Sequence, residues 1–165
     1  MLFTEFLILN ESIDDYKNWK KNNVTLRGVK EGNNDNQIYG SFGSGLYTVP
    51  LSNKKFIKQY GELRFVVNAI PKNPKIVNSL NDAEIWRQTI IKKFCDKHNE
   101  SYNIGFFENN TSFEKEMLNI GYDGFIIKGR EIVNYKPKDI LYFKTEDQLI
   151  RYYEQMIKNN WNYYL

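Results

Sequence analysis

The sequence predicts an α+β protein, on two observations. Segments rich in β-branched and aromatic residues recur along the 165-residue chain, and residues 63–70 are the clearest of them. Segments with apolar residues at helical spacing fall between them without a regular alternation. The expected order is a helix, two strands, a helix, one or two strands, two helices, two or three strands and a closing helix. Neither an internal repeat nor a linker is visible, so we expect a single domain over residues 1–165.

The composition is that of an ordinary folded chain, with 41% hydrophobic and 26% charged residues. The net charge of +3 is too balanced to indicate a nucleic-acid-binding protein by itself, although it suits a phosphate-bearing ligand. The single cysteine, Cys95, excludes an internal disulfide and fits a reducing compartment. Residues 1–9 lack a basic region and carry Glu5 within a short apolar run. We therefore expect no signal peptide and no membrane span, and a cytoplasmic protein.

The first part of the chain is expected to hold a short helix and a strand. Residues 3–9 fit a strand or a helix equally well. Ser12 and Asp15 resemble a capping box, which predicts a helix from this point to about residue 23. The segments expected to follow are a strand over residues 24–29 and a Gly/Asn/Asp-rich loop over residues 31–36.

Residues 40–50, Gly-Ser-Phe-Gly-Ser-Gly-Leu-Tyr-Thr-Val-Pro, join a turn to a strand. The three glycines allow the backbone to bend, whereas residues 46–49 are of types that a pleated strand favours. A loop that enters a strand and carries an aromatic residue near its end can provide the floor for a flat ligand. That aromatic residue is Tyr47.

A short helix and a buried strand are expected next. Ser52 is expected to cap the helix, and Gly61 to end it just after Tyr60. The continuous apolar run over residues 63–70 indicates a strand covered on both faces. The helix residues expected to face inward are Phe56, Ile57 and Tyr60.

Two further helices are predicted in the second half of the chain. The longer is expected to be capped by Asn81 and to run to about His98. The shorter has a capping box of Thr111 and Glu114 and ends at Gly121. The other expected elements are an edge strand over residues 75–78, a loop over 99–110, strands over 124–129 and 131–135 that could also be one bulged strand, a strand over 140–143, and a final helix capped by Thr145 with Gln148.

Three short motifs fall on or beside the predicted strands: Leu26-Arg-Gly28, Gly43-Ser-Gly-Leu-Tyr47 and Gly121-Tyr-Asp-Gly124, the last of which leads to Glu131. Their order and spacing resemble the ADP-ribosyltransferase superfamily, and small phage and bacterial members most closely. The resemblance covers about residues 24–140. It implies a split β-sandwich of two small sheets flanked by helices. It also implies an enzyme that takes NAD as substrate, releases nicotinamide and transfers ADP-ribose to an acceptor.

The resemblance implies a role for individual residues. In the family an Arg or His lies on the first core strand, here Arg27, and a catalytic Glu lies late in the chain, here Glu131. An arginine offers a fork of donors to a phosphate or ribose oxygen, and an aromatic ring offers a face to nicotinamide. Gly28 is expected to let its backbone pair with the carboxamide of nicotinamide. The residues expected to bind NAD are Arg27, Gly28, Ser41, Gly45, Tyr47 and Thr48; no metal is expected.

Glu131 is expected to act near the ribose. Cleavage of the nicotinamide–ribose bond passes through an oxocarbenium-like transition state, which a nearby carboxylate stabilises. The leaving group is already cationic, so no general acid is needed and one carboxylate suffices. Arginine-modifying members have a second carboxylate two residues earlier, where this chain has Gly129, which argues against arginine as acceptor. We expect the acceptor to be a host protein or a nucleic acid, modified by a viral or bacterial effector in the host cytoplasm.

Other interpretations stay open, because the motif is a hybrid. Arg27 fits one subgroup of the family, Gly-Leu-Tyr fits the subgroup that begins with His, and the Ser-Thr-Ser element expected beside Arg27 is absent. An NAD glycohydrolase, with water as acceptor, is one alternative. An inactive relative that binds a partner protein, for instance as inhibitor of a defence system, is another. Taken singly, the ordinary interpretations are a glycine turn, a core Tyr47, an exposed hairpin Glu131, an ion-paired Arg27, and a solvated helix face for the lysines at 54, 55 and 58.

Overall fold

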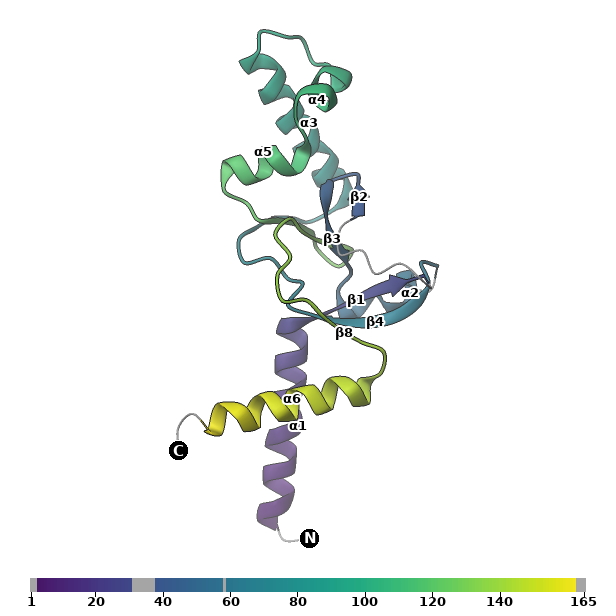
Figure 1. Cartoon of the computed structure of the whole chain (residues 1–165), viewed down its shortest axis with the longest axis vertical. Coiled ribbons are helices and arrows are strands. Elements are labelled where there is room, and N and C mark those ends of the chain that lie inside the picture. Colours follow the sequence, from purple (N-terminus) through teal and green to yellow (C-terminus); the bar gives the residue numbers. More distant parts are fainter. Residues whose placement is uncertain (1–2, 31–37, 58, 163–165) are drawn as a thin grey trace.

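A computed structural model describes residues 3–30, 38–57 and 59–162 (Figure 1). It confirms an α+β protein with two small sheets flanked by helices. The expected loop over residues 31–36 lies outside the described residues. Among the residues described, no helix combines the length and apolar character needed to cross a membrane.

The smaller sheet is antiparallel and has three strands in the order β1-β4-β8. β1 is an edge strand, so one side of its backbone is turned away from this sheet. All three strands of this sheet were predicted, because their segments are rich in β-branched or aromatic residues. The strands are β1 (Val24–Val29), β4 (Glu62–Val67) and β8 (Leu141–Phe143).

The larger sheet has five strands in the order β2-β3-β7-β6-β5. All neighbouring pairs are antiparallel except β5 and β6, which are parallel. β6 and β7 form the predicted hairpin, and β5 is the predicted edge strand. The strands are β2 (Ile38–Gly40), β3 (Gly43–Thr48), β5 (Pro74–Val77), β6 (Gly124–Ile127) and β7 (Glu131–Asn134).

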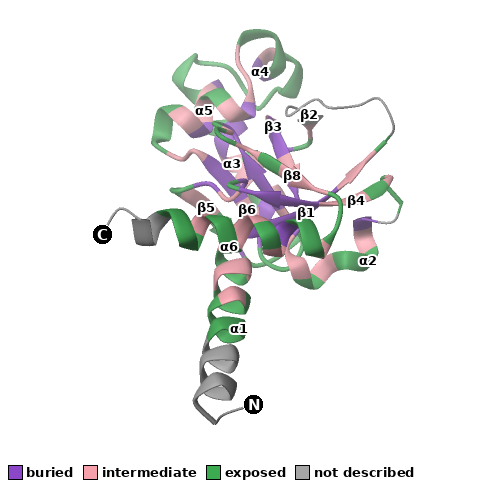
Figure 2. Ribbon diagram, turned by 60° about the horizontal axis from the view of Figure 1, so that its bottom comes forward, coloured by how far each residue is buried: buried purple, intermediate pink, exposed green. Residues whose placement is uncertain are grey.

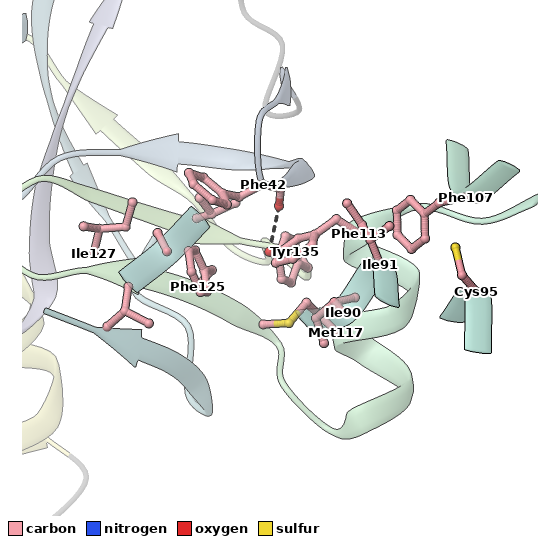
Figure 3. Packing of buried hydrophobic residues seen from close by; sticks show 13 residues of the cluster. Phe42, Ile90, Ile91, Cys95, Phe107, Phe113, Met117, Phe125, Ile127 and Tyr135 are labelled. Atoms are coloured by element: carbon pink, nitrogen blue, oxygen red, sulfur yellow. Dashed lines mark hydrogen bonds between the residues drawn. The ribbon is translucent and has the colours of Figure 1, made fainter. Parts of the chain in front are cut away.

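Two helices, α3 (Leu80–Lys97) and α5 (Phe113–Ile120), pack against the larger sheet, and α4 (Ile104–Asn110) packs against α3. Their apolar side chains meet the sheet in the largest cluster of buried residues, part of which Figure 3 shows. Phe125 of β6 lies within this cluster and contacts the rings of Phe42 and Phe113, with centroids 5.0 and 5.8 Å apart. The tyrosine hydroxyl of Tyr135 donates a 2.7 Å hydrogen bond to the carbonyl of Phe42.

The other helices pack against the smaller sheet: α1 (Phe3–Asn23), α2 (Lys54–Ile57), which follows a short 3-10 turn over Leu51–Asn53, and α6 (Glu146–Asn162). Leu149 of α6 is fully buried against this sheet. Glu146 links the two long helices, since its carboxylate accepts hydrogen bonds from Lys20 and from the hydroxyl of Tyr16. Figures 1 and 2 show α1 extending away from the sheets toward the N-terminus.

The two sheets meet through a small apolar cluster and a backbone bridge. Leu46, Val66 and Ala69 are buried together between them. Leu26 and Val49 exchange two backbone hydrogen bonds, both 2.8 Å long. Within the described ranges, this is the one isolated bridge outside the named strands. The junction between the sheets is therefore narrow.

Several predicted helix starts were wrong. α1 begins at Phe3 and continues through Ser12, so Ser12 caps nothing. Ser79, and not Asn81, caps α3 by accepting from the Asp82 amide. α5 is capped by Ser112, which accepts from the Lys115 amide in place of the predicted Thr111 and Glu114 box. In α3 and α5 a nearby serine takes the capping role, because Ser, Thr and Asn have similar capping chemistry.

Two predicted segments also differ in extent. Residues 99–110, expected as a loop, contain α4, which Asn103 caps. The helix expected to reach Tyr60 ends at Ile57, and the side chain of Tyr60 is 50% exposed instead of facing inward. By contrast, the predicted cap of α6 is confirmed, because Thr145 and Gln148 each bond to the other's backbone amide.

Candidate functional site

A pocket of about 250 Å³ lies where the two sheets and α2 meet. It contains five of the seven residues predicted to form a site, and they come from separate parts of the chain. Arg27 and Gly28 belong to the smaller sheet, whereas Tyr47, Thr48 and Glu131 belong to the larger. The remaining lining residues are Leu26, Val49, Phe56, Ile57 and Tyr60.

The free edge of β1 faces this pocket. Leu26 uses its N–H and C=O to pair with Val49, on the side away from β4. Successive residues of a strand alternate in the direction of these groups, so the N–H and C=O of Gly28 project from the same edge. No backbone partner for them occurs among the described residues outside the β1–β4 ladder. They are available to a planar amide that enters the pocket.

Gly28 also allows close packing of the pocket wall. A Cβ at this position would lie 2.8 Å from the Cβ of Tyr60 and 3.0 Å from the carbonyl oxygen of Ile57. Any side chain would therefore displace the segment that carries the aromatic residues of the wall. The rings of Phe56 and Tyr60 pack together there with centroids 5.1 Å apart.

Tyr47 forms part of the pocket while its hydroxyl holds the preceding turn. The hydroxyl donates to the carbonyl of Gly43 at 2.7 Å and accepts from the amide of Phe42 at 3.2 Å. Gly43 has a φ of +93°, which an L side chain rarely adopts. A Cβ on Gly40 would lie 2.5 Å from the Tyr47 ring. The glycine-rich stretch thus positions the ring, as the sequence suggested.

Thr48 lines the pocket, but its hydroxyl is enclosed. The residue is 2% exposed, and its Oγ1 has no hydrogen-bond partner among the described residues. A buried hydroxyl without a partner costs about 1–3 kcal/mol. Thr48 lies opposite Ile132, so its side chain is on the other face of the larger sheet from Tyr47 and Glu131.

Glu131 is the first residue of β7 and lies on the same face of the larger sheet as Tyr47. This follows from the register, because Tyr47 is opposite Val133 and Glu131 is two residues from it. The carboxylate is half-buried and forms no ion pair with another described residue. Burial raises the pKa of Glu131 above its ordinary value, and the positive charge of Arg130 offsets only part of that effect.

The raised pKa of Glu131 predicts a pH-dependent cost to folding. Below the unfolded-state pKa of Glu131 its side chain is protonated in both states and burial costs nothing. As the pH rises through the higher folded-state pKa the side chain becomes charged in the folded protein, and the stability of the fold falls. Glu131→Gln should therefore increase the free energy of unfolding at pH 7. The gain should disappear at about pH 3, below the usual glutamate pKa of about 4.3. Urea denaturation at both pH values measures it.

The matched control for this test is Glu62→Gln, because the Glu62 side chain is 78% exposed and pairs only with Arg64. An exposed pair of this kind contributes little. A stability gain at pH 7 that is equal in both variants, or absent in Glu131→Gln, would contradict the assigned burial of the Glu131 charge.

Arg27 is nearly buried, with 9% of its surface exposed. Its guanidinium donates to the hydroxyl of Tyr142 on β8 at 3.1 Å. Arg27 is on the opposite face of β1 from Leu26 and Gly28, so its side chain lies between the sheets. The arrangement fixes a positive charge at the pocket without using all five guanidinium donors in this bond.

Two predicted site residues lie elsewhere. Ser41 lines a separate polar pocket of about 360 Å³ with Arg87 and Glu108. Gly45 faces β7, where a Cβ would lie 2.7 Å from the carbonyl oxygen of Asn134. Sequence reasoning also missed Phe56 and Tyr60 as pocket residues. Their spacing of four residues directly after the glycine-rich stretch is the signal that indicates a shared aromatic wall.

No group of three or more His, Cys, Asp or Glu side chains in the described part of the chain is arranged to hold a metal ion. In comparisons with protein-family models, curated proteins and solved structures, the chain matches none. The chemistry of the pocket is therefore the basis for a functional assignment.

Proposed function

We propose that the chain is an ADP-ribosyltransferase of the split β-sandwich type, which cleaves NAD in the pocket between its two sheets. The observation that carries the proposal is the convergence of Arg27, Gly28, Tyr47, Thr48 and Glu131 on one pocket. They come from three separate segments of the chain, each of which belongs to one of the short motifs or follows it. The pocket also has the mixture that nicotinamide riboside requires: aromatic walls, a free amide-pairing edge and one carboxylate.

Each group has a distinct part in binding. The open N–H and C=O of Gly28 match the donor and acceptor of a carboxamide, and the Tyr47 ring offers a face to a cationic heterocycle. Arg27 contributes a fixed positive charge to the negatively charged remainder of NAD.

Glu131 supplies the chemistry. An unpaired carboxylate in a partly desolvated pocket stabilises positive charge on the ribose more strongly than one in water. The proposed role needs the ionised form of Glu131. Because its pKa is raised, activity should begin to fall at a higher pH, as the solution is acidified, than it would with an exposed glutamate. The nicotinamide ring accepts the electrons of the broken glycosidic bond and leaves as a neutral molecule.

The direct test supplies NAD labelled in its adenylate part and measures two products. Labelled material bound to a macromolecule in a cell lysate supports transfer, and released nicotinamide reports cleavage. The proposal is wrong if the wild-type chain neither binds NAD, measured as a thermal shift, nor releases nicotinamide.

NAD glycohydrolase activity is the second candidate, and one observation favours it. Gly129, two residues before Glu131, has nothing within 4 Å of where a Cβ would lie, and the turn around it is exposed. No second carboxylate is present there to orient an acceptor, and water has free access. Free ADP-ribose formed at the full rate without any macromolecule would identify this activity.

Two substitutions at Tyr47 distinguish the role of its ring from that of its hydroxyl. Tyr47→Phe should cost about 1 kcal/mol of stability through its lost hydrogen bonds, yet retain NAD cleavage. Tyr47→Ala should lower nicotinamide release at low NAD by about ten-fold, the value of one aromatic contact. Release is measured below the unfolding temperature of both variants.

Tyr102→Ala provides the control for Tyr47→Ala, since Tyr102 is 47% exposed and lies outside the pocket. If Tyr47→Ala and Tyr47→Phe cleave NAD equally well, the ring is a scaffold for the turn and does not bind nicotinamide.

A further inference from the structure

Four exposed cations are close in sequence to residues that line the pocket. Lys30 follows β1, Lys55 precedes Phe56 in α2, and Lys128 and Arg130 form the turn before Glu131. All four are exposed, and each is within three residues of a pocket-lining residue. We refer to these four residues as the cationic rim. None forms an ion pair with another described residue.

Acidic residues are scarce around the same pocket. Among the described residues that are within three sequence positions of a lining residue, the only acidic ones are Glu62 and Glu131. Glu62 is already paired, with its carboxylate 3.0 Å from Arg64. Lys54 is left out of the cationic rim because its charge acts on Glu146 of α6. The charge of Arg130 acts on Glu131 inside the pocket, and the other three cations of the rim have no ion-pair partner among the described residues.

An aromatic surface accompanies this charge. Tyr60 is 50% exposed, packs against Phe56 and lines the pocket. Positive side chains that follow phosphates, combined with exposed rings on which bases stack, are the features by which proteins bind single-stranded nucleic acids. An acidic peptide would use the cations and leave the ring of Tyr60 without a partner.

We propose that the cationic rim and Tyr60 bind a single-stranded nucleic acid across the mouth of the pocket, which makes that strand the acceptor. The role as acceptor rests on the proposed function, whereas binding of the strand does not. In the transfer, the bond between ribose C1 and the nicotinamide nitrogen breaks, and its electron pair leaves with nicotinamide. A nitrogen or oxygen of the strand forms a new bond to C1 and loses its proton to solvent.

Binding is tested by fluorescence anisotropy with labelled DNA and RNA single strands of about 12 nucleotides, within the range that such sites cover. The double variant Lys128→Ala/Arg130→Ala should bind more weakly. Its logarithmic dependence on salt should fall by about 1.4, because each phosphate contact of a single strand contributes about 0.7. Tyr60→Ala should weaken binding roughly ten-fold with the salt dependence unchanged.

The matched control is Lys92→Ala/Lys93→Ala, which removes the same charge from the exposed surface of α3. It should bind like the wild-type chain. The inference is overturned if no strand binds at about 50 mM salt, if both double variants lose affinity equally, or if polyglutamate of equal charge binds as tightly as the strand.

NAD carries phosphates too, so the experiment must separate the two sources of negative charge. Lys128→Ala/Arg130→Ala should keep the wild-type thermal shift with NAD; a lost shift would assign the rim to NAD and overturn the inference. The labelled product is then treated with nuclease or with protease. Release of the labelled ADP-ribose by nuclease alone supports the strand as acceptor, and release by protease alone contradicts it. If strands bind as expected and NAD is never cleaved, the proposed function fails and the binding site stands.

Discussion

Glu131→Gln is expected to lower the rate of nicotinamide release from NAD by about a hundred-fold to a thousand-fold, the usual effect of removing one group that stabilises charge in a transition state. The variant keeps the shape and hydrogen-bonding capacity of the side chain but loses its negative charge. Nothing in the described chain replaces that charge, because no other carboxylate lines the pocket. Release is measured at saturating NAD, so that the loss appears in kcat.

Three readouts make this result specific to chemistry. The variant should retain its NAD-dependent thermal shift, since Arg27, Gly28 and Tyr47 are unchanged. It should also be at least as stable as the wild-type chain at neutral pH, as the raised pKa of Glu131 requires. Glu62→Gln, which alters an exposed carboxylate outside the pocket lining, should release nicotinamide at the wild-type rate. Undiminished release by Glu131→Gln would sink the assignment of this residue.

Phe125→Ala is expected to have the largest effect on stability, about 3–5 kcal/mol. Phe125 is fully buried, and no larger side chain is as completely enclosed in the described chain. The truncation removes ring contacts with Phe42 and Phe113, two rings that also contact each other (Figure 3). Natural domains of this size are stable by about 5–15 kcal/mol, so the loss is a large share of the total.

The measurement is the urea midpoint, with an unchanged dependence on urea concentration as evidence for a simple loss of stability. Ile76→Ala is the control, because Ile76 lies on neighbouring β5 and is 50% exposed. It should cost less than about 1 kcal/mol. A comparable loss in both variants would show that Phe125 does not organise the core. The amide of Phe42 also bonds to Tyr47, so the loss should extend to the site.

Strands were predictable from this sequence because their side chains carry a local signal. β1, β4, β6 and β7 are runs of β-branched and aromatic residues, and breaks at Pro71 and Gly129 separate them. Helix starts were less predictable, since adjacent Ser, Thr and Asn residues have similar capping ability. α4 was missed because its seven residues include a glycine and two asparagines, which favour loops in isolation.

The candidate site was predictable where short motifs specified it and unpredictable where distant contacts did. Arg27 and Glu131 are over a hundred positions apart in the chain, and only their match to a family pattern placed them together. The aromatic wall depends on the approach of Tyr60 to Gly28, a contact between a strand and the segment after a helix. Ser41 and Gly45 were predicted from the resemblance, but Ser41 lies in the turn between β2 and β3 and Gly45 packs against Asn134 of β7.

The bridge between Leu26 and Val49 has a consequence for how ligand and fold depend on each other. Pocket residues come from both sheets, and those sheets share few backbone bonds. A molecule that contacts Gly28 on one sheet and Glu131 on the other adds non-covalent contacts that hold the two sheets together. Binding of the ligand and separation of the two sheets are then coupled. A bound ligand makes separation of the sheets less favourable, and any change that holds the sheets together increases the affinity for the ligand. Amide exchange at Leu26 and Val49, which form this bridge, should therefore slow when the pocket is occupied.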